Sequence, residues 1–459
     1  MLTFPKLNVL PTNEISIDSF NGIDKSSAAE KNSVFEAYNI SSEAMPRLKT
    51  RSGRKKIFSL SDGTSFKRLF SFDRAYFTAA YNGGMRLFRS RTFDTIVLVY
   101  TSKENELLSD VLCKFDDCLC IFNIKKLDGK HFEALMLYDN DTGEKARVKL
   151  PYFEDAITYK NRIFACADRK VYACAYNDAT NWDTEELRTD IQNRAVTLTE
   201  SSKAAFVTCT VHKNTALFFT SRELYRLKGS DAESFALEKV DDFGCISKNS
   251  LCSCNGALYF MSQKGLAKYG SGKVEFIDFP LSLNASDVKS AVLCAGKKTV
   301  YVLVETEHGK EMYTYNTQNG GFACEESINA VGATSYLGNP YFMDESTIYE
   351  FEVPYSLANE KNELNWQVET QKFCCNLSRS RGSKINLGIC VEKGGLAEVL
   401  IDVDDSGWQV ISTILEGEKD VCIPLPISDF KSIRIRINGV GQGEISFIKL
   451  EYYKGAEGR

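Results

Sequence analysis

Two groups of closely spaced cysteines come nearest to a metal site in this sequence. Cys113, Cys118 and Cys120 form one group, and Cys252 and Cys254 form the other. Residues two apart on a strand point to the same side, so each group would offer thiolates on one face. Structural zinc, however, usually takes a tight Cys-x-x-Cys pair with a matching second pair, and the sequence has none. We therefore predict no metal and no other cofactor.

A short acidic segment also resembles a metal-binding loop. Asp402 to Gly407 reads DVDDSG, which matches the start of an EF-hand loop with its oxygen ligands at positions one, three and five. The twelfth position is Thr413 instead of Glu, and the flanking residues alternate as strands do. The segment therefore predicts a hairpin turn.

Catalytic patterns are missing from the sequence. His131, His212 and His308 lie far apart and share no motif. There is no G-x-S-x-G elbow, no Walker loop and no H-E-x-x-H helix. We predict that the protein is not an enzyme and has no catalytic residues. A hydrolase with two facing carboxylates at a central axis stays open as a third possible function, because the sequence does not say which acidic residues lie close together.

A basic run near the amino terminus is the candidate interaction site. The whole chain has a net charge of −5, whereas this short run contains six cationic residues. Positive charge is therefore concentrated near the amino terminus. One interpretation is a solvated linker, and the other is an electrostatic contact with an acidic partner surface. Packaged DNA is a less favoured target, whose binding would depend strongly on salt. The run consists of Arg47, Lys49, Arg51, Arg54, Lys55 and Lys56.

Hairpin-like segments recur along the chain and must position these residues. Each joins a polar turn, an apolar strand, a short break and a second strand that ends in an aromatic residue. The copies start near residues 73, 116, 160, 213, 255, 297 and 338. Their spacing of roughly 41 to 53 residues is close to the ~40–45-residue period of propeller blades.

The repeats predict an all-β fold with a β-propeller over residues 61–360. A small sheet cannot bury both apolar faces alone, and a ring of sheets solves this by radial packing. Seven blades fit the copies best, while six or eight blades, a β-solenoid or a pair of sandwiches are alternatives.

The two ends of the chain differ from the repeats. Residues 361–459 show several alternating strands with Gly-rich turns, which predicts a β-sandwich of jelly-roll type. In FKSIRIRIN, the isoleucines point to one face and Arg434 and Arg436 to the other. Residues 1–60 are predicted to form an extended arm and linker.

The composition predicts a protein that has a hydrophobic core and no membrane-spanning helix. Aromatic residues make up 12% of the chain, and no apolar run reaches the ~18 residues of a membrane helix. The first residues lack the pattern of a signal peptide. The number of cysteines, 15, is odd for a set of disulfides, so we expect mainly free thiols and synthesis in the cytosol.

The amino-terminal segment resembles that of bacteriophage virion proteins from tails and head-to-tail connectors. The shared pattern is Phe-x-Gly, an Asn followed by Ser-Ser, Pro-x-Leu, and Arg-x-Gly-Arg. It is carried by Phe20, Gly22, Asn39, Ser41, Ser42, Pro46, Leu48, Arg51, Gly53 and Arg54. A hairpin of the same group is matched by Asn161, Arg162, Tyr172, Asn181 and Trp182.

The resemblance covers most of the chain, and none of its pieces is a catalytic motif. It implies a structural role in a virion, made in the host bacterial cytoplasm, with other virion proteins and copies of itself as partners. Contact with packaged DNA or a host glycan is also open. The alternative function is a lectin-like module that binds a cell-surface glycan.

Overall fold

The computed structural model describes residues 12–25, 32–60, 64–139, 143–185, 190–200, 204–277, 279, 288–358, 364–374, 380–417 and 419–454. The chain divides into two compact units. The first consists of residues 1–52, 313–326 and 360–459, and the second of residues 53–312 and 327–359. Strands dominate, so the all-β prediction is confirmed. Single 3-10 turns occur at Ser42–Ala44, Ile191–Asn193 and Tyr355–Leu357.

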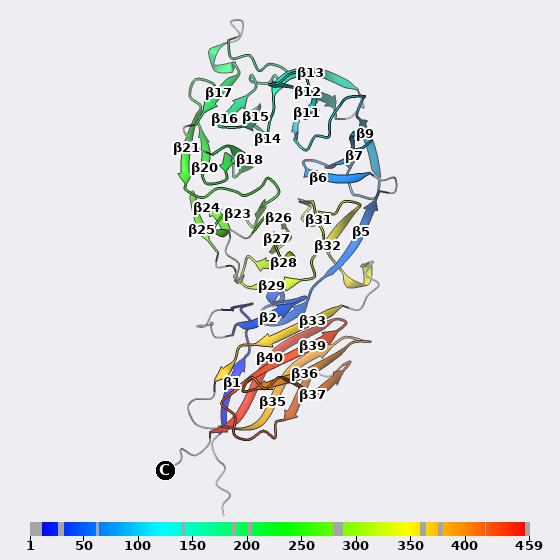
Figure 1. Cartoon of the computed structure of the whole chain (residues 1–459), viewed down its shortest axis with the longest axis vertical. Helices are drawn as coiled ribbons and strands as arrows, with labels where there is room; N and C mark the ends of the chain where they lie inside the picture. The colour runs from blue at the N-terminus through cyan, green and yellow to red at the C-terminus, as the bar shows by residue number, and fades with distance from the viewer. Residues whose placement is uncertain are drawn as a thin grey trace, which may run out of the picture. The chain divides into compact units, whose positions relative to one another are not determined.

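The second unit is a series of antiparallel meanders that follow one another around a common centre (Figure 1). In each sheet, consecutive strands of the chain are hydrogen-bonded neighbours. This is a propeller-like arrangement. The first four sheets are β6 (Ser65–Ser71), β7 (Ala75–Tyr81), β8 (Gly84–Ser90) and β9 (Ile96–Thr101); β10 (Leu112–Phe115), β11 (Cys118–Lys126), β12 (His131–Tyr138) and β13 (Glu144–Pro151); β14 (Asp155–Tyr159), β15 (Arg162–Ala167), β16 (Lys170–Ala173) and β17 (Val196–Thr199); and β18 (Phe206–His212), β19 (Thr215–Thr220), β20 (Leu224–Lys228) and β21 (Ala236–Asp241). They are followed by β22 (Leu251–Cys254), β23 (Ala257–Ser262), β24 (Gly265–Gly270) and β25 (Lys273–Phe276); β26 (Ser290–Ala295), β27 (Thr299–Thr306) and β28 (Gly309–Asn316); and β30 (Gly332–Tyr336), β31 (Asn339–Met343) and β32 (Thr347–Val353). The last four residues of β28 are counted with the first unit.

A strand from the amino-terminal part of the chain completes the last of these sheets. β5 (Gly53–Ser59) pairs antiparallel with β32, and Ser59 lies opposite Thr347. The outer strand of this sheet therefore comes from the start of the second unit, and the other three come from its end. Such pairing joins the two ends of the unit in one sheet.

Tight turns join the first two strands of most sheets, and they fall where the sequence repeats were predicted to start. The two-residue turns are Asp116-Asp117, Lys160-Asn161, Lys213-Asn214, Asn255-Gly256 and Leu337-Gly338. The first residue of each has a positive φ, between 46° and 51°. This backbone matches the twist of a hairpin, which explains the preference for Asn, Asp and Gly.

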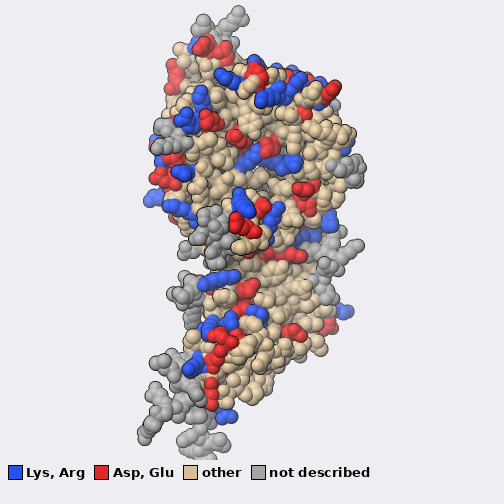
Figure 2. All heavy atoms as spheres, viewed as in Figure 1, with Lys and Arg blue, Asp and Glu red and all other residues tan. Residues whose placement is uncertain are grey.

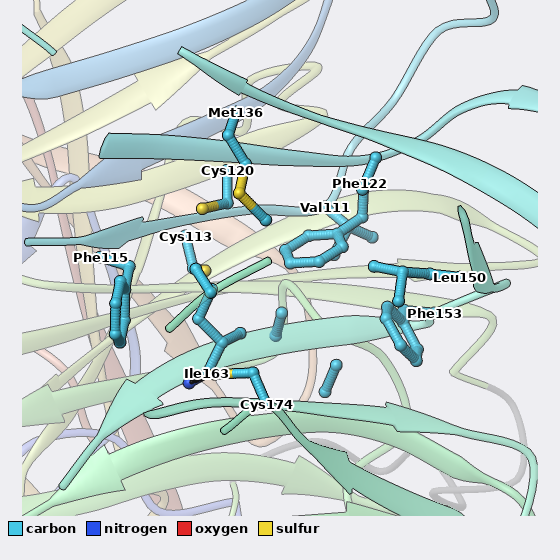
Figure 3. Packing of buried hydrophobic residues seen from close by; sticks show 14 of the residues in the cluster. Val111, Cys113, Phe115, Cys120, Phe122, Met136, Leu150, Phe153, Ile163 and Cys174 are labelled. Atoms are coloured by element: carbon cyan, nitrogen blue, oxygen red, sulfur yellow. Dashed lines mark hydrogen bonds between the residues drawn. The ribbon is translucent and has the colours of Figure 1, made fainter. Parts of the chain in front are cut away.

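Apolar side chains from neighbouring sheets fill the space between them. One cluster joins the sheet of β10–β13 to the sheet of β14–β17, and includes Phe122, Met136, Phe153 and Cys174 (Figure 3). The middle strands are buried on both faces, and all six residues of β15 are buried. This explains why cysteine and alanine are frequent there, because small side chains fit between packed sheets.

The first unit contains two sheets. In one, β40 pairs with β1, β4 and β35, β3 pairs with β4, and β38 pairs with β35; in the other, the order is β29-β2-β33-β39-β36-β37, with β34 beside β39. The strands are β1 (Thr12–Ile17), β2 (Val34–Tyr38), β3 (Ile40–Ser41), β4 (Leu48–Thr50), β29 (Phe322–Glu325), β33 (Asn365–Thr370), β34 (Phe373–Cys374), β35 (Ser380–Val391), β36 (Leu396–Val403), β37 (Trp408–Leu415), β38 (Asp420–Pro424), β39 (Ser432–Val440) and β40 (Gly443–Lys454).

Trp366 links the two sheets of the first unit. It lies on β33 and is 2% exposed. A Cβ atom at Gly439 on β39 would lie 2.0 Å from the indole ring, and one at Gly443 on β40 would lie 2.8 Å from it. The ring therefore reaches from its own sheet to a strand of the other one, and glycine is required where the backbone passes it.

The amino-terminal segment differs from the predicted extended arm. Its described part contributes β1, β2, β3 and β4 to the sheets of the first unit and β5 to the second unit. Apart from β3, which pairs with β4, these strands pair with strands from the carboxyl half of the chain, and no local sequence pattern indicates such pairing. Residues 1–11 and 26–31 of the predicted arm lie outside the described residues.

Candidate functional site

A cavity of about 500 Å³ lies at the centre of the second unit. Residues from the first strands β6, β10, β14, β18, β22, β26 and β30 line it. Its charged lining residues are Arg68, Asp155 and Lys248. The first strands therefore bring together charged groups that are far apart in the sequence.

Asp155 and Arg68 form the best-buried charged pair of the cavity. Nη1 of Arg68 lies 3.3 Å from Oδ1 of Asp155, and the two side chains are 12% and 6% exposed. Thr208 Oγ1 donates a hydrogen bond of 2.6 Å to the other carboxylate oxygen. Arg68 belongs to the sheet of β6, Asp155 to that of β14, and the sheet of β10 lies between them in the chain. The pair therefore connects sheets that are not consecutive.

A second contact connects two more non-consecutive sheets. Lys248, which precedes β22, forms an ion pair with Asp110, which precedes β10. The backbone oxygen of Asp110 also accepts a hydrogen bond of 2.8 Å from Arg68. Nearby, Asn249 donates to the backbone oxygen of Val331 at 3.1 Å. The charged groups of the cavity are thus engaged with one another.

A further buried carboxylate lies between the first two sheets. Asp139 is 4% exposed, and its carboxylate accepts hydrogen bonds from Tyr76 and, at 2.9 Å, from Lys114. Lys114 also lies 2.6 Å from Asp73. Burial raises the pKa of Asp139, but the hydrogen bonds from Tyr76 and Lys114 outweigh it and lower the pKa below its ordinary value of 3.8. Burial and Asp139 raise the pKa of Tyr76.

Three thiols also line the cavity, from β18, β22 and β26. They are Cys209, Cys252 and Cys294. Burial raises the pKa of Cys294, so the thiol is held in its protonated, less nucleophilic form. None of the fourteen cysteines in the described part of the chain forms a disulfide. Among the described residues, no group of three or more His, Cys, Asp or Glu side chains is arranged to hold a metal ion.

Of the residues singled out for metal or acid chemistry, Cys252 lines this cavity, whereas the histidines and the DVDDSG segment do not. His131 is an exposed partner of Asp128 at 2.9 Å. Burial lowers the pKa of His212, whose Nδ1 lies 3.3 Å from Ser253 Oγ. The DVDDSG segment joins β36 to β37, so the predicted hairpin turn is confirmed. There Asp404 accepts hydrogen bonds from the backbone of Lys431 and Ser432.

The basic run is divided between the two units. Arg47 and Lys49 are exposed in the first unit, and Arg47 lies 2.6 Å from Glu444. Lys55 and Lys56 are exposed on β5 in the second unit. The run thus belongs to two different sheets.

Two members of the run are buried, which its sequence did not indicate. Arg51 donates to Asn39 Oδ1 at 3.1 Å and lies 3.2 Å from Glu326 within the first unit. Arg54 lies over the ring of Phe351, 4.5 Å from its centroid, in the second unit. Burial leaves Arg47, Lys49, Lys55 and Lys56 as the exposed cations of the run.

Sequence reasoning missed Arg68, Asp155, Asp110 and Lys248. A signal becomes visible when the repeats are aligned on their first turns. Five residues before the turn stand Val111, Asp155, Thr208, Ser250 and Gly332, so Asp155 is the charged exception among small side chains.

No protein-family model and no curated protein matches the sequence. A catalytically inactive virginiamycin B lyase from Staphylococcus aureus, solved with quinupristin, has a TM-score of 0.45 and 11% identity, over 65% of this chain and 99% of that chain. The extracellular domain of a hybrid two-component system from Bacteroides thetaiotaomicron has a TM-score of 0.45 and 11% identity, over 80% of this chain and 48% of that chain. A quinoprotein alcohol dehydrogenase-like protein from the same species has a TM-score of 0.40 and 12% identity, over 64% and 69%.

The first of these structures contradicts the prediction that the protein is not an enzyme, because virginiamycin B lyase is an enzyme. The prediction rested on missing sequence motifs, and a catalytic site assembled from separate strands leaves no such motif. At 11% identity the likeness concerns the fold and carries no activity to this chain.

Neither sign of charge dominates the one face of the molecule that Figure 2 draws. Lys and Arg side chains are interspersed with Asp and Glu over the face drawn in Figure 2. No helix among the described residues has the length and apolar character needed to cross a bilayer.

Proposed function

We propose that the protein is a structural component of a bacteriophage particle, in the tail or the head-to-tail connector. In this proposal the second unit is a seven-bladed propeller that serves as a rigid scaffold. The observation that carries it is the contact of Asp155 with Arg68 across the central cavity. A paired charge between non-consecutive sheets resists their displacement, which suits a part that transmits load within an assembly.

The order of the sheets supports the proposed count of seven blades. Six meanders of four strands account for β5 to β25 and β30 to β32, and β26, β27 and β28 supply a further blade between β25 and β30. β5 then closes the ring by pairing with β32. A closed ring leaves short edges and favours rigidity.

The first unit is proposed to be the sandwich that contacts neighbouring proteins. Trp366 reaches between its two sheets, which fits face-to-face packing. On the other face of β39, Arg434 and Arg436 pair with the buried carboxylate of Glu369 at 3.0 and 2.6 Å. Such a charged network favours a defined surface over a flexible one.

Partners in this proposal are other virion proteins and further copies of this chain. In this proposal the protein is located in the virion, after its synthesis in the bacterial cytoplasm. The resemblance of the amino-terminal segment to tail and connector proteins supports this role. The exposed cations Arg47, Lys49, Lys55 and Lys56 are proposed contacts for acidic neighbouring surfaces.

The proposal is tested on particles purified by density gradient from the organism that carries the sequence. Quantitative mass spectrometry should find this chain at a fixed ratio to the major capsid protein. A matched fraction of lysate proteins, followed through the same gradient, controls for carry-over. A chain that stays with the lysate proteins would exclude the virion role.

A further inference from the structure

The central cavity of the second unit is lined by strand edges. Each of the seven first strands is the end strand of its sheet, and Figure 1 shows β6, β14, β18 and β26 around the centre. Successive side chains of a strand point to opposite faces, so consecutive residues can line one cavity only where the strand edge faces it. Such runs occur at 68–72, 155–157, 208–210, 251–253 and 333–335. Backbone N–H and C=O groups of these edges therefore face the cavity.

The charged groups at one end of the cavity are matched within the protein. Arg68 Nη1 bonds to Asp155 and to the backbone oxygen of Asp110, and Lys248 pairs with the Asp110 carboxylate. Glu154 lies beside this group and is not one of the lining residues. Burial, and then Asp110 and Asp155, raise the pKa of Glu154, although Lys248 acts against them. These pairings leave the cavity without a strong preference for a ligand of either charge.

Polar atoms at this end retain hydrogen-bonding capacity. Nε and Nη2 of Arg68 have no partner in the described part of the chain, and they are accessible to water. The same is true of Asn249 Oδ1, while Nδ2 of this residue donates to Val331. Guanidinium N–H groups donate and an amide oxygen accepts. The lining therefore offers both donors and an acceptor to a ligand that carries hydroxyl groups.

Phe72 adds an exposed aromatic ring to this polar lining. It follows β6, lines the cavity and is 37% exposed. Its ring stacks on that of Phe70, with 6.3 Å between centroids, and lies 5.7 Å from that of Tyr76. The neighbouring charge of Asp73 is paired with Lys114 at 2.6 Å. The ring is thus held by other aromatic rings and keeps part of its apolar surface open.

The combination of an aromatic ring with unused donors and acceptors fits a saccharide. Sugar hydroxyls both donate and accept hydrogen bonds, and one face of a pyranose ring carries C–H groups that pack on an aromatic ring. Small-molecule sites combine aromatic side chains with a few placed polar groups in about 300–1,000 Å³. The volume of this cavity, about 500 Å³, lies within that range.

The spacing of the two features sets the length of the ligand. Arg68 and Phe72 are four residues apart along one extended segment, which separates their backbones by about 13 Å. This exceeds the length of a single sugar ring. We propose that the cavity binds a saccharide of at least two units, with one ring on Phe72 and the hydroxyls of another bonded to Arg68 and Asn249.

This inference goes beyond the scaffold role proposed above and does not depend on it, since it needs only the cavity of the second unit. It is tested with purified full-length protein. Absence of the chain from particles would overturn the virion role and leave saccharide binding unaffected. Failure to bind any saccharide would overturn this inference and leave the virion role standing.

Saturation-transfer difference NMR provides the first test. The probes are maltose, cellobiose, lactose and N,N′-diacetylchitobiose at millimolar concentration, each compared with its monosaccharides, and trialanine, which could pair with strand edges as a peptide. At least one disaccharide should bind at least about tenfold more tightly than its monosaccharides, a gain of ~1.4 kcal/mol. Saturation of aromatic protons should reach the C–H groups of one ring most strongly. Binding of no saccharide, equal binding of both lengths, or binding of trialanine alone would overturn the proposal.

Phe72→Leu tests the aromatic contact. Leucine keeps an apolar side chain against Phe70 and lacks the flat ring, so the disaccharide should bind at least about tenfold more weakly. Phe276→Leu is the matched control, because Phe276 is 40% exposed, lies outside the cavity and packs on Phe243 with 4.4 Å between centroids. Its affinity should equal that of wild type. Undiminished binding by Phe72→Leu would contradict the proposal.

Arg68→Lys tests the polar end. Lysine keeps a positive charge beside Asp155 and removes the guanidinium donors Nε and Nη2. Affinity for the disaccharide should fall about tenfold, whereas affinity for a monosaccharide on Phe72 should not change. Equal losses for both lengths, or no loss, would contradict the placement of the second sugar. The length dependence of wild-type binding remains decisive if this variant folds poorly.

Discussion

Asp155 on β14 holds Arg68 on β6 across the central cavity, with 3.3 Å between carboxylate and guanidinium. Thr208 and the backbone of Cys209 complete the donors to Asp155 at 2.6 and 3.4 Å. A buried ion pair repays its desolvation only when further hydrogen bonds satisfy its atoms, and here they do. The ion pair therefore stabilises the contact between the sheet of β6 and the sheet of β14.

Removing Asp155 should destabilise the second unit strongly. Asp155→Ala leaves the Arg68 guanidinium buried without its carboxylate, and the expected loss in unfolding free energy is about 3–5 kcal/mol. Urea unfolding followed by tryptophan fluorescence measures it. Asp94→Ala, at an exposed position, is the control and should change stability by less than ~0.5 kcal/mol. Equal effects of the two substitutions on the unfolding free energy would show that the ion pair of Asp155 with Arg68 does not stabilise the protein.

The folded protein should become less stable in acid because the carboxylate of Asp139 is protonated there. Its pKa lies below 3.8 in the folded protein, so its contribution is complete above the pKa of the unfolded chain and is lost as pH falls through the folded value. Asp139→Asn should therefore be less stable than wild type at neutral pH, with a difference that shrinks below pH ~3.8. Thermal melts over a pH series test this, with Asp168→Asn as an exposed control. A difference that does not change with pH would refute the role of the ionised carboxylate.

The first unit should not tolerate a side chain at Gly439. Gly439→Ala places a methyl group 2.0 Å from the indole of Trp366 and should cost about 1–3 kcal/mol by overpacking. Gly270→Ala is the matched control, because nothing lies within 4 Å of its Cβ position. Combining Gly439→Ala with Trp366→Leu should recover part of the loss. Strictly additive losses would argue against contact between these residues.

Thiol titration should separate exposed from buried cysteines. Cys374 and Cys422 are exposed and should react rapidly with a disulfide reagent in the folded protein. Burial raises the pKa of Cys174 to about 12, so this thiol should react only on unfolding. Unfolding without reductant should release nearly all 15 cysteines of the chain. A much lower count would mean that disulfides form, against the cytosolic origin.

Local turn chemistry explains how much of the fold could be predicted. The turns at Asp116, Lys160, Lys213 and Asn255 stand where the repeats were expected, because each is fixed by residues within the hairpin. The pairing of β5 with β32 joins segments from opposite ends of the unit, so no local sequence pattern predicted it.

The central site escaped prediction for the same reason. Arg68 and Asp155 meet only after three sheets have taken their places, and neither residue belongs to a motif. Likewise, the basic run gave no sign that Arg51 and Arg54 are buried, since burial of arginine depends on partners such as Asn39 and Phe351.

The proposed scaffold role is tested most directly by the amount of this chain in purified particles. Cryo-electron microscopy of those particles, with the ring of sheets fitted to the tail or connector density, should place the protein at a fixed, symmetric position. That result, together with a constant ratio to the capsid protein, is what the account predicts. Particles that are complete and infectious without this chain would contradict it.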